Sequence, residues 1–179
     1  MKTILAVLVA TAALAAPPDR WLHVRVQSGQ NENVRVNIPL SMAEKVLPAI
    51  RVNKLKDGRL KVGKEDISVD LHALFEAVRT SPDNEFVSVQ NAEEDVRVAK
   101  LGGNLLVRVR EGHRSRSHQS VDVTIPLPVV EALLSGGKDE LNILAGIHAL
   151  GVQGDITLVS VTDAHDNVRI WIDSKNRSD

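Results

Sequence analysis

The stretch VRVNIPLSMAEKVL, residues 34–47, decides the fold because the chain repeats it as VDVTIPLPVVEALL, residues 121–134, at a constant offset of 87. In both copies β-branched residues alternate with polar ones up to a proline, which is typical of a half-buried antiparallel strand. Each proline ends its strand, where a missing amide donor harms the sheet least. A helical pattern follows, and Ser41 and Glu44 have the spacing of a capping box. We therefore expect, twice, a strand that runs into a helix.

A second internal match closes each copy. VSVQNAEEDVRV, residues 87–98, aligns without gaps on VSVTDAHDNVRI, residues 159–170, at an offset of 72. The alternation around a polar turn predicts a hairpin, and a second helix is expected before it, with Asp70 as the cap in the first copy. The change of offset places 15 extra residues between the helices of the first copy. There, Asp57-Gly58 predicts a small added hairpin or a loop.

These matches predict an α+β fold of two tandem ββααββ repeats, repeat 1 over residues 17–101 and repeat 2 over residues 102–179. A unit of this size buries little apolar surface alone, so we expect the copies to share a core. The turn at Gly102-Gly103 is short enough to pair the last strand of repeat 1 with the first strand of repeat 2. We expect a pseudo-twofold antiparallel sheet of about eight strands with the helices packed on one face. Two four-stranded layers around a helical middle are the alternative.

The first 15 residues resemble a targeting segment. They contain one Lys, an apolar run from Ile4 to Leu14, and small residues, Ala13 and Ala15, at the positions that precede a cut after Ala15. The run is shorter than the roughly 20 apolar residues that a spanning helix needs. We therefore predict a signal peptide over residues 1–15, export to the periplasm or the extracellular space, and no membrane span after cleavage.

The composition argues against several classes of function. The chain has no Cys, so it has no disulfide, no metal-thiolate site and no thiol nucleophile. Aromatic residues make up 2% of it, which disfavours stacking of sugars or of single-stranded nucleic acid. The net charge of −1 argues against a strong field over the whole molecule. We expect no sequence-specific nucleic-acid partner.

Arginines within the expected strands form the first candidate site. Each of them lies between β-branched residues, so its side chain points away from the apolar face. These residues are Arg25, Arg35, Arg97, Arg108 and Arg169. In a continuous sheet they would form a surface that binds phosphate, sulfate or carboxylate groups, because guanidinium groups match such oxygens bidentately. In the ordinary alternative, they cover the sheet and pair with neighbours such as Asp122 and Asp173.

The loop EGHRSRSHQS is the second candidate site, for an anion or a metal, and it contains His113, Arg114, Arg116 and His118. A metal site needs three or four converging ligands, and two histidines fall short of that number, so a solvated loop is favoured over a metal. The acidic tips QNAEED and TDAHDN are interpreted as solvated turns. The isolated histidines are expected at the surface or between helices: His23, His72 and His148.

The strand and helix order resembles the SHOCT-like domain, which occurs in bacterial proteins associated with envelope stress. The segments that carry the resemblance are Val24–Val26, Val34–Leu40, Val107–Val109 and Val121–Leu127. It would cover most of the chain after residue 15 as two tandem copies. The resemblance implies a small α+β module that has no catalytic residues and serves a binding or regulatory role.

The leading hypothesis is a non-catalytic, exported interaction module of the cell envelope. It would contact an unidentified protein or an envelope polyanion through its polar sheet face or its hairpin loops, with no cofactor. The chain contains neither a phosphate-binding loop nor a G-x-S-x-G or H-E-x-x-H motif. One alternative is a hydrolase that acts outside the cytoplasm through an unrecognised site. The other is a structural protein that self-associates through edge strands as a homo-oligomer.

Overall fold

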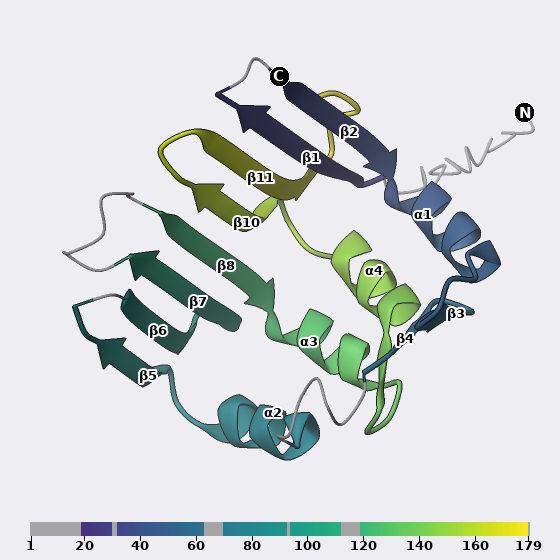
Figure 1. Ribbon diagram of the computed structural model, residues 1–179. Helices are drawn as coiled ribbons and strands as arrows, with labels where there is room; N and C mark the ends of the chain where they lie inside the picture. The colour runs from purple at the N-terminus through teal and green to yellow at the C-terminus, as the bar shows by residue number, and fades with distance from the viewer. Residues whose placement is uncertain (1–18, 30–31, 63–69, 93, 112–118, 179) are drawn as a thin grey trace, which may run out of the picture.

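The structure is a computed structural model that describes residues 19–29, 32–62, 70–92, 94–111 and 119–178. The fold is α+β and is dominated by an eight-stranded antiparallel sheet (Figure 1). Its strands are β1 (Trp21–Ser28), β2 (Asn33–Pro39), β5 (Asn84–Gln90), β6 (Glu94–Leu101), β7 (Asn104–Glu111), β8 (Ser120–Pro126), β10 (Ile156–Thr162) and β11 (Asp166–Asp173). They lie in the order β2-β1-β11-β10-β8-β7-β6-β5.

The large sheet is continuous, and the alternative of two four-stranded layers is therefore wrong. The predicted pairing across the central turn is confirmed, since β6 pairs with β7 and Leu101 lies opposite Asn104. Gly102 and Gly103 have φ values of 56° and 76°, a region that glycine enters without steric cost. The sequence analysis did not predict that β1 pairs with β11, which joins the first hairpin of the chain to the last.

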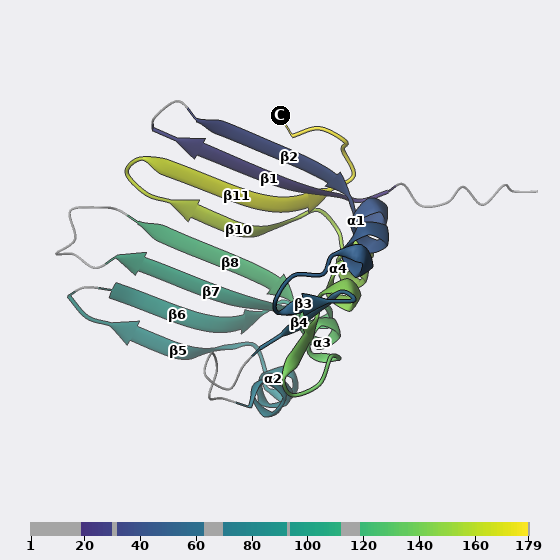
Figure 2. The ribbon, with the colours of Figure 1, turned by 45° about the vertical axis from the view of Figure 1, so that its right-hand side comes forward.

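The helices form a layer with a second, three-stranded sheet. The helices are α1 (Leu40–Val46), η1 (Leu47–Ala49, a 3-10 helix), α2 (Leu71–Thr80), α3 (Leu127–Leu134) and α4 (Ile143–Gly151). The small sheet has the order β3-β4-β9 and consists of β3 (Leu55–Lys56), β4 (Arg59–Lys61) and β9 (Glu140–Asn142). The predicted hairpin at Asp57-Gly58 is confirmed as the β3–β4 turn, in which both residues have positive φ. The helix layer lies along one end of the long strands (Figure 2).

One face of the large sheet carries two rows of β-branched residues that cross all eight strands. From β2 to β5, the first row is Val34, Val26, Val168, Val161, Val121, Val109, Val96 and Val89. The second row is Val36, Val24, Ile170, Val159, Val123, Val107, Val98 and Val87. We call this side the valine face. None of these side chains is buried, and the exposed ones are on β2 and β5.

The helices cover only the end of the valine face. Leu105 lies two residues from Val107 on β7 and therefore on the same face. It packs against the buried cluster of Phe75, Leu127 and Leu134, which come from α2 and α3. The prediction that the helices pack on one face thus holds at the strand ends, and the two valine rows gain their partial burial mainly from neighbouring strands.

The helix caps test the sequence analysis at single residues. Asp70 caps α2 as predicted, because its carboxylate accepts hydrogen bonds from the amides of His72 and Ala73, both at 3.0 Å. The predicted capping box of α1 is wrong. The helix begins at Leu40, directly after Pro39, so Ser41 lies inside the first turn, and its hydroxyl donates to a carboxylate oxygen of Asp19 instead.

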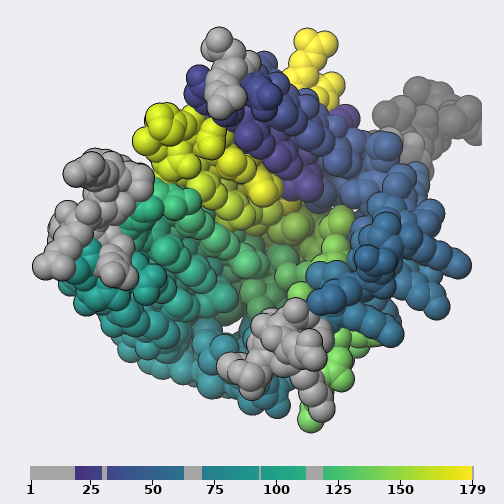
Figure 3. Space-filling view, viewed as in Figure 1, coloured from purple at the N-terminus to yellow at the C-terminus, as the bar shows by residue number. Residues whose placement is uncertain are grey.

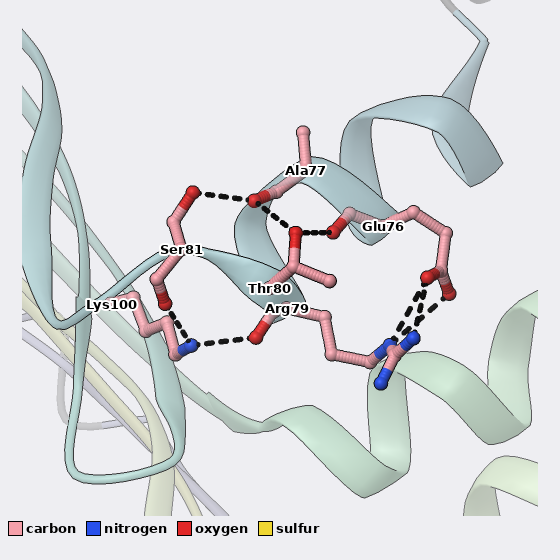
Figure 4. A network of polar contacts seen from close by, with 6 residues as sticks. All are labelled: Glu76, Ala77, Arg79, Thr80, Ser81 and Lys100. Carbon is pink, nitrogen blue, oxygen red and sulfur yellow. Dashed lines mark hydrogen bonds and ion pairs between the residues drawn. The ribbon is translucent and has the colours of Figure 1, made fainter.

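A lysine ties the end of α2 to the large sheet (Figure 4). The Lys100 ammonium group on β6 donates to the carbonyl oxygens of Arg79 at 2.8 Å and Ser81 at 2.6 Å. A cation at this position satisfies helix carbonyls that have no partner within the helix and interacts favourably with the helix dipole. Within α2, Arg79 also forms a 2.6 Å ion pair with Glu76. These contacts fix α2 beside the edge of the sheet that β5 forms.

We expect residues 17–101 alone to show no cooperative thermal unfolding. This fragment contains β1, β2, β5 and β6, but four strands from the remainder of the chain separate β1 from β6 in the sheet. An isolated hairpin is marginally stable in water. Circular dichroism during heating measures the transition, with the chain of residues 16–179 as the control. A sharp, reversible transition of the fragment would show that one half folds without the other.

We expect Gly146→Ala to destabilise the protein, although alanine favours helices. A β-carbon at this position in α4 would lie 2.5 Å from Cδ2 of Leu133 in α3. Overpacking of this kind costs about 1–3 kcal/mol, more than the roughly 1 kcal/mol gained in helix propensity. Urea unfolding measures the change, and Gly154→Ala, which meets nothing within 4 Å, is the control. A Gly146→Ala variant more stable than the parent would contradict this close α3–α4 contact.

Candidate functional site

The second face of the large sheet brings all five predicted strand arginines into one row. From β2 to β5, the residues in register are Arg35, Arg25, Arg169, Ser160, Asp122, Arg108, Arg97 and Ser88. We call this row the arginine row and its side of the sheet the arginine face. The prediction that these side chains share one face follows the strand period of two, and the register confirms it.

The half of the arginine row on β5 to β8 is neutralised by carboxylates. Arg97 donates from Nε to Asp95 Oδ1 at 3.0 Å. Arg108 donates from Nε to Asp122 Oδ1 at 2.7 Å, and Arg110 approaches the same oxygen at 3.4 Å. The hydrogen bond from Arg97 holds the pKa of Asp95 below its ordinary value, and Asp95 raises the pKa of Arg97 in return. The ordinary pairing of arginine with Asp122 is thus confirmed here.

The other half of the row concentrates positive charge. Arg35, Arg25 and Arg169 lie opposite one another on the neighbouring strands β2, β1 and β11, and we call them the arginine cluster. Within the described residues, no carboxylate forms an ion pair with any of the three. The Nε atom of Arg25 is buried and has no hydrogen-bond partner there. Like charges that face each other across strands are destabilising, so the cluster is a cost that a bound anion would offset.

Two carboxylates distinguish the two halves. Each half has two facing arginines followed by a serine: Arg25, Arg169 and Ser160 in the first, Arg108, Arg97 and Ser88 in the second. Beside the two arginines stands Arg35 in the first half and Asp122 in the second. Asp122 pairs with Arg108, whereas Arg97 pairs with Asp95, which corresponds to Asn167 beside Arg169 at the offset of 72.

The floor beside the arginine cluster is a buried stack of rings. The guanidinium carbon of Arg169 lies 4.8 Å from the ring centroid of Trp171, within the range of a cation–π interaction. Trp171 stacks on His23, with centroids 4.9 Å apart and planes 22° apart. His23 is fully buried; its Nδ1 lies 2.6 Å from Asn37 Oδ1 and its Nε2 3.1 Å from Asp173 Oδ1. The expectation that His23 lies at the surface or between helices is therefore wrong.

Two hollows lie on the arginine face. One, of about 360 Å³, is lined by Arg169 and Trp171 and by Lys175 and Arg177 of the segment after β11. The other, of about 430 Å³, is lined by residues of the neutralised half, among them Arg97, Arg108 and Asp122. The sequence analysis missed Lys175 and Arg177. Their signal was the basic composition of SKNRS directly after the last strand, but only the folded chain places this segment beside Arg169.

The remaining predicted residues divide into three groups. His113, Arg114, Arg116 and His118, like the predicted signal peptide, lie outside the described residues. The helix histidines contact other elements as expected, since His72 Nε2 lies 3.2 Å from the carbonyl oxygen of Gly137 and His148 Nδ1 lies 3.2 Å from Glu44 Oε1. Asp163 accepts hydrogen bonds from the amides of His165 and Asp166, both at 2.7 Å, as the interpretation of a turn requires.

The described part of the chain contains no group of three or more His, Cys, Asp or Glu side chains that could hold a metal ion. In the same residues, no helix is long and apolar enough to cross a membrane.

Comparison with known proteins gives one partial match. A family model for the C-terminal domain of YvlB-like proteins matches residues 20–99, a little less than half of the chain. No curated protein and no solved structure matches the chain. The matched segment runs from β1 into β6 and so contains the four strands at the two ends of the large sheet. The resemblance to SHOCT-like domains stays a prediction.

We expect Asp173→Asn to destabilise the protein at neutral pH and to matter less in acid. Burial raises the pKa of the Asp173 carboxyl. Hydrogen bonds from the Lys175 amide, Trp171 and His23 lower this pKa by a larger amount, so that it lies below its ordinary 3.8. A carboxylate whose pKa is lowered by folding stabilises the folded state at pH values above its ordinary pKa. This contribution is lost as the pH falls through the pKa of the folded state. Hydrogen bonds to a charged group contribute about 1.5–3 kcal/mol.

Urea unfolding of both proteins at pH 7 and near pH 3 measures this effect, with the gap expected to narrow at the lower pH. Asp155→Asn is a matched control, because Asp155 makes a 2.8 Å ion pair with Arg20 but its side chain is 65% exposed. Such a surface pair contributes little. An unchanged gap at both pH values would contradict the role given to the Asp173 charge.

Proposed function

We propose that the protein is an exported, non-catalytic interaction module of the cell envelope that binds a polyanionic partner through the arginine cluster. The observation that carries the proposal is the placement of Arg35, Arg25 and Arg169 in cross-strand register without carboxylate partners among the described residues. Guanidinium groups bind phosphate, sulfate and carboxylate oxygens bidentately. A partner with several such groups would relieve the repulsion and gain charge-assisted hydrogen bonds at once.

The surroundings of the cluster favour binding over hydrolysis. Lys175 and Arg177 extend the positive charge into the adjoining hollow. The two carboxylates that line it are already engaged, Asp155 by Arg20 and Asp173 by Trp171 and His23. An acid or base for hydrolysis would have to leave these partners. The export part of the proposal is supported by the pattern of residues 1–15.

We also propose that the fold arose from two copies of a ββααββ unit, residues 17–101 and 102–179. Register shifts and helix caps occur at equivalent positions of the two halves, 72 residues apart in the sequence, and this agreement supports such an origin. The register shift of β5 between Glu85 and Val87 corresponds to the shift of β10 between Thr157 and Val159. The side-chain cap of α4, Asn142, likewise corresponds to Asp70 of α2.

In this proposal, the copies exchange hairpins. One four-stranded block of the sheet is β2-β1-β11-β10 and the other is β8-β7-β6-β5, so each block contains one hairpin from each copy. Strands that match in sequence, such as β2 and β8, then lie four positions apart in the sheet. A shift of four strands relates the blocks, and the strand order gives no support to the pseudo-twofold relation that we expected. The exchange explains why neither copy would complete a sheet alone.

We expect Arg35→Asp to weaken retention on a heparin resin and Asp122→Arg to strengthen it. The first change places a carboxylate opposite Arg25, as Asp122 lies opposite Arg108, and the second change removes the carboxylate partner of Arg108 and Arg110. The salt concentration at elution measures both effects, since screening weakens such contacts. Each single variant changes the net charge by two, whereas the double variant restores it.

Arg51→Asp is the matched control, because it makes the same change of charge on a loop residue that is 73% exposed, outside the large sheet. Its elution should change less than that of Arg35→Asp. Equal shifts for Arg35→Asp and Arg51→Asp would show that only net charge matters, and this outcome would overturn the cluster as the binding site.

A further inference from the structure

The two edges of the large sheet, β2 and β5, lie at opposite ends of the molecule (Figures 1 and 3). Three of the four row valines on the edge strands are exposed, whereas those on the strands between them are all half-buried. The exposed fractions are 50% for Val34, 42% for Val87 and 44% for Val89. The cause is the absence of a neighbouring strand beyond each edge among the described residues. Such edges are templates for pairing with another chain.

The centre of the same sheet contains a junction between strands that match these edges in sequence. β8 repeats β2 at the offset of 87, and β10 repeats β5 at the offset of 72. β8 and β10 pair antiparallel, with Val123 opposite Val159 and Val121 opposite Val161. All four of these valines are half-buried. The molecule thus contains the pairing of a β2-like strand with a β5-like strand.

We propose that the β5 edge of one copy of this chain pairs with the β2 edge of a second copy, in the register of the β8–β10 junction. Transfer of that register by the two offsets predicts the intermolecular pairs Val87–Val36, Ser88–Arg35, Val89–Val34 and Gln90–Asn33. The pairing continues both valine rows into the next molecule and covers the exposed edge valines. It rests on the duplication proposed above and does not depend on polyanion binding.

Features that could prevent an edge strand from pairing with another chain are also present in β8 and β10, which do pair with each other. β2 ends in Pro39, but β8 ends in Pro126 and still pairs with β10 through residues 120–123. The register shift in β5 has a counterpart in β10, which also pairs on both sides. Neither edge strand contains lysine, a residue that often protects sheet edges. The charges of Arg35 on β2 and Glu85 on β5 are opposite in sign.

The proposed contact is heterologous, because it uses a different surface on each partner. Each added copy leaves one β2 edge and one β5 edge free, so association proceeds beyond a dimer to an open chain or a closed ring. The average mass of the wild-type protein should therefore rise with concentration beyond the mass of a dimer. Light scattering measures this rise on the chain of residues 16–179, which contains every described element.

Single cysteines test the register, because the natural chain has none. We would mix a Val34→Cys chain with a mass-tagged Val89→Cys chain and oxidise the mixture mildly. The expected product is a mixed disulfide dimer, since strand neighbours bring the two α-carbons within the roughly 7 Å that a disulfide requires. The control pairs Val34→Cys with Val152→Cys, whose valine is 77% exposed and follows α4. Its yield reports random collision, and the proposed pair should exceed it about tenfold.

Yields equal to the collision control, or a predominance of dimers linked through two Val34→Cys chains, would overturn the proposal. A constant monomer mass across the concentration series would also overturn it. A Val36→Cys and Val87→Cys mixture repeats the test in the second valine row and guards against an unfavourable disulfide angle at one pair. The heparin experiment is run at concentrations where the protein is monomeric, so its outcome and the failure of self-association are distinguishable.

Discussion

The large sheet depends on the pairing of β1 with β11, which joins the beginning of the described chain to its end. The register runs without a break from Trp21 opposite Asp173 to Ser28 opposite Asp166. Without it, β1 and β2 would form a lone hairpin, which is marginally stable in water. His23 lies at this junction, and both of its ring nitrogens contact polar groups although it is fully buried. A buried polar group satisfied in this way is compatible with only one register.

The same register determines the chemistry of both faces. Because side chains alternate along every strand, one alignment produces the valine rows on one face and the arginine row on the other. A slip by a single residue would place arginines among the valines, so the apolar rows enforce the placement of the charges. The arginine cluster is therefore held together against its own repulsion by the valine face and the β1–β11 junction. The cluster lowers the stability of the protein, and a bound anion would recover part of that loss.

The sequence predicted what local patterns determine and missed what long-range pairing determines. The strands that end at Pro39 and Pro126, the turn at Asp57-Gly58 and the cap at Asp70 follow from neighbouring residues. The face of each arginine also follows from strand alternation. The surroundings of His23 depend on β11, about 150 residues away in the chain, and no local pattern specifies that partner. The α1 cap failed for a smaller reason: the helix begins two residues earlier than the motif assumes, and Asp19 reaches Ser41 from before β1.

The valine face is only partly buried, so each strand of the large sheet depends on its neighbouring strands to shield its valines from water. The fully buried core is small and lies at the helix end of the strands, so most valines are shielded sideways by the next strand. Each strand thus protects its neighbour, and the protection fails only at β2 and β5. Successive blocks of four strands repeat at about 19 Å, given a strand spacing of about 4.8 Å. The arginine cluster lies in one block and the neutralised half of the row in the other. The positive charge therefore varies along the same axis as the apolar contacts, and a long polyanion lying across the strands would meet one cluster in each molecule.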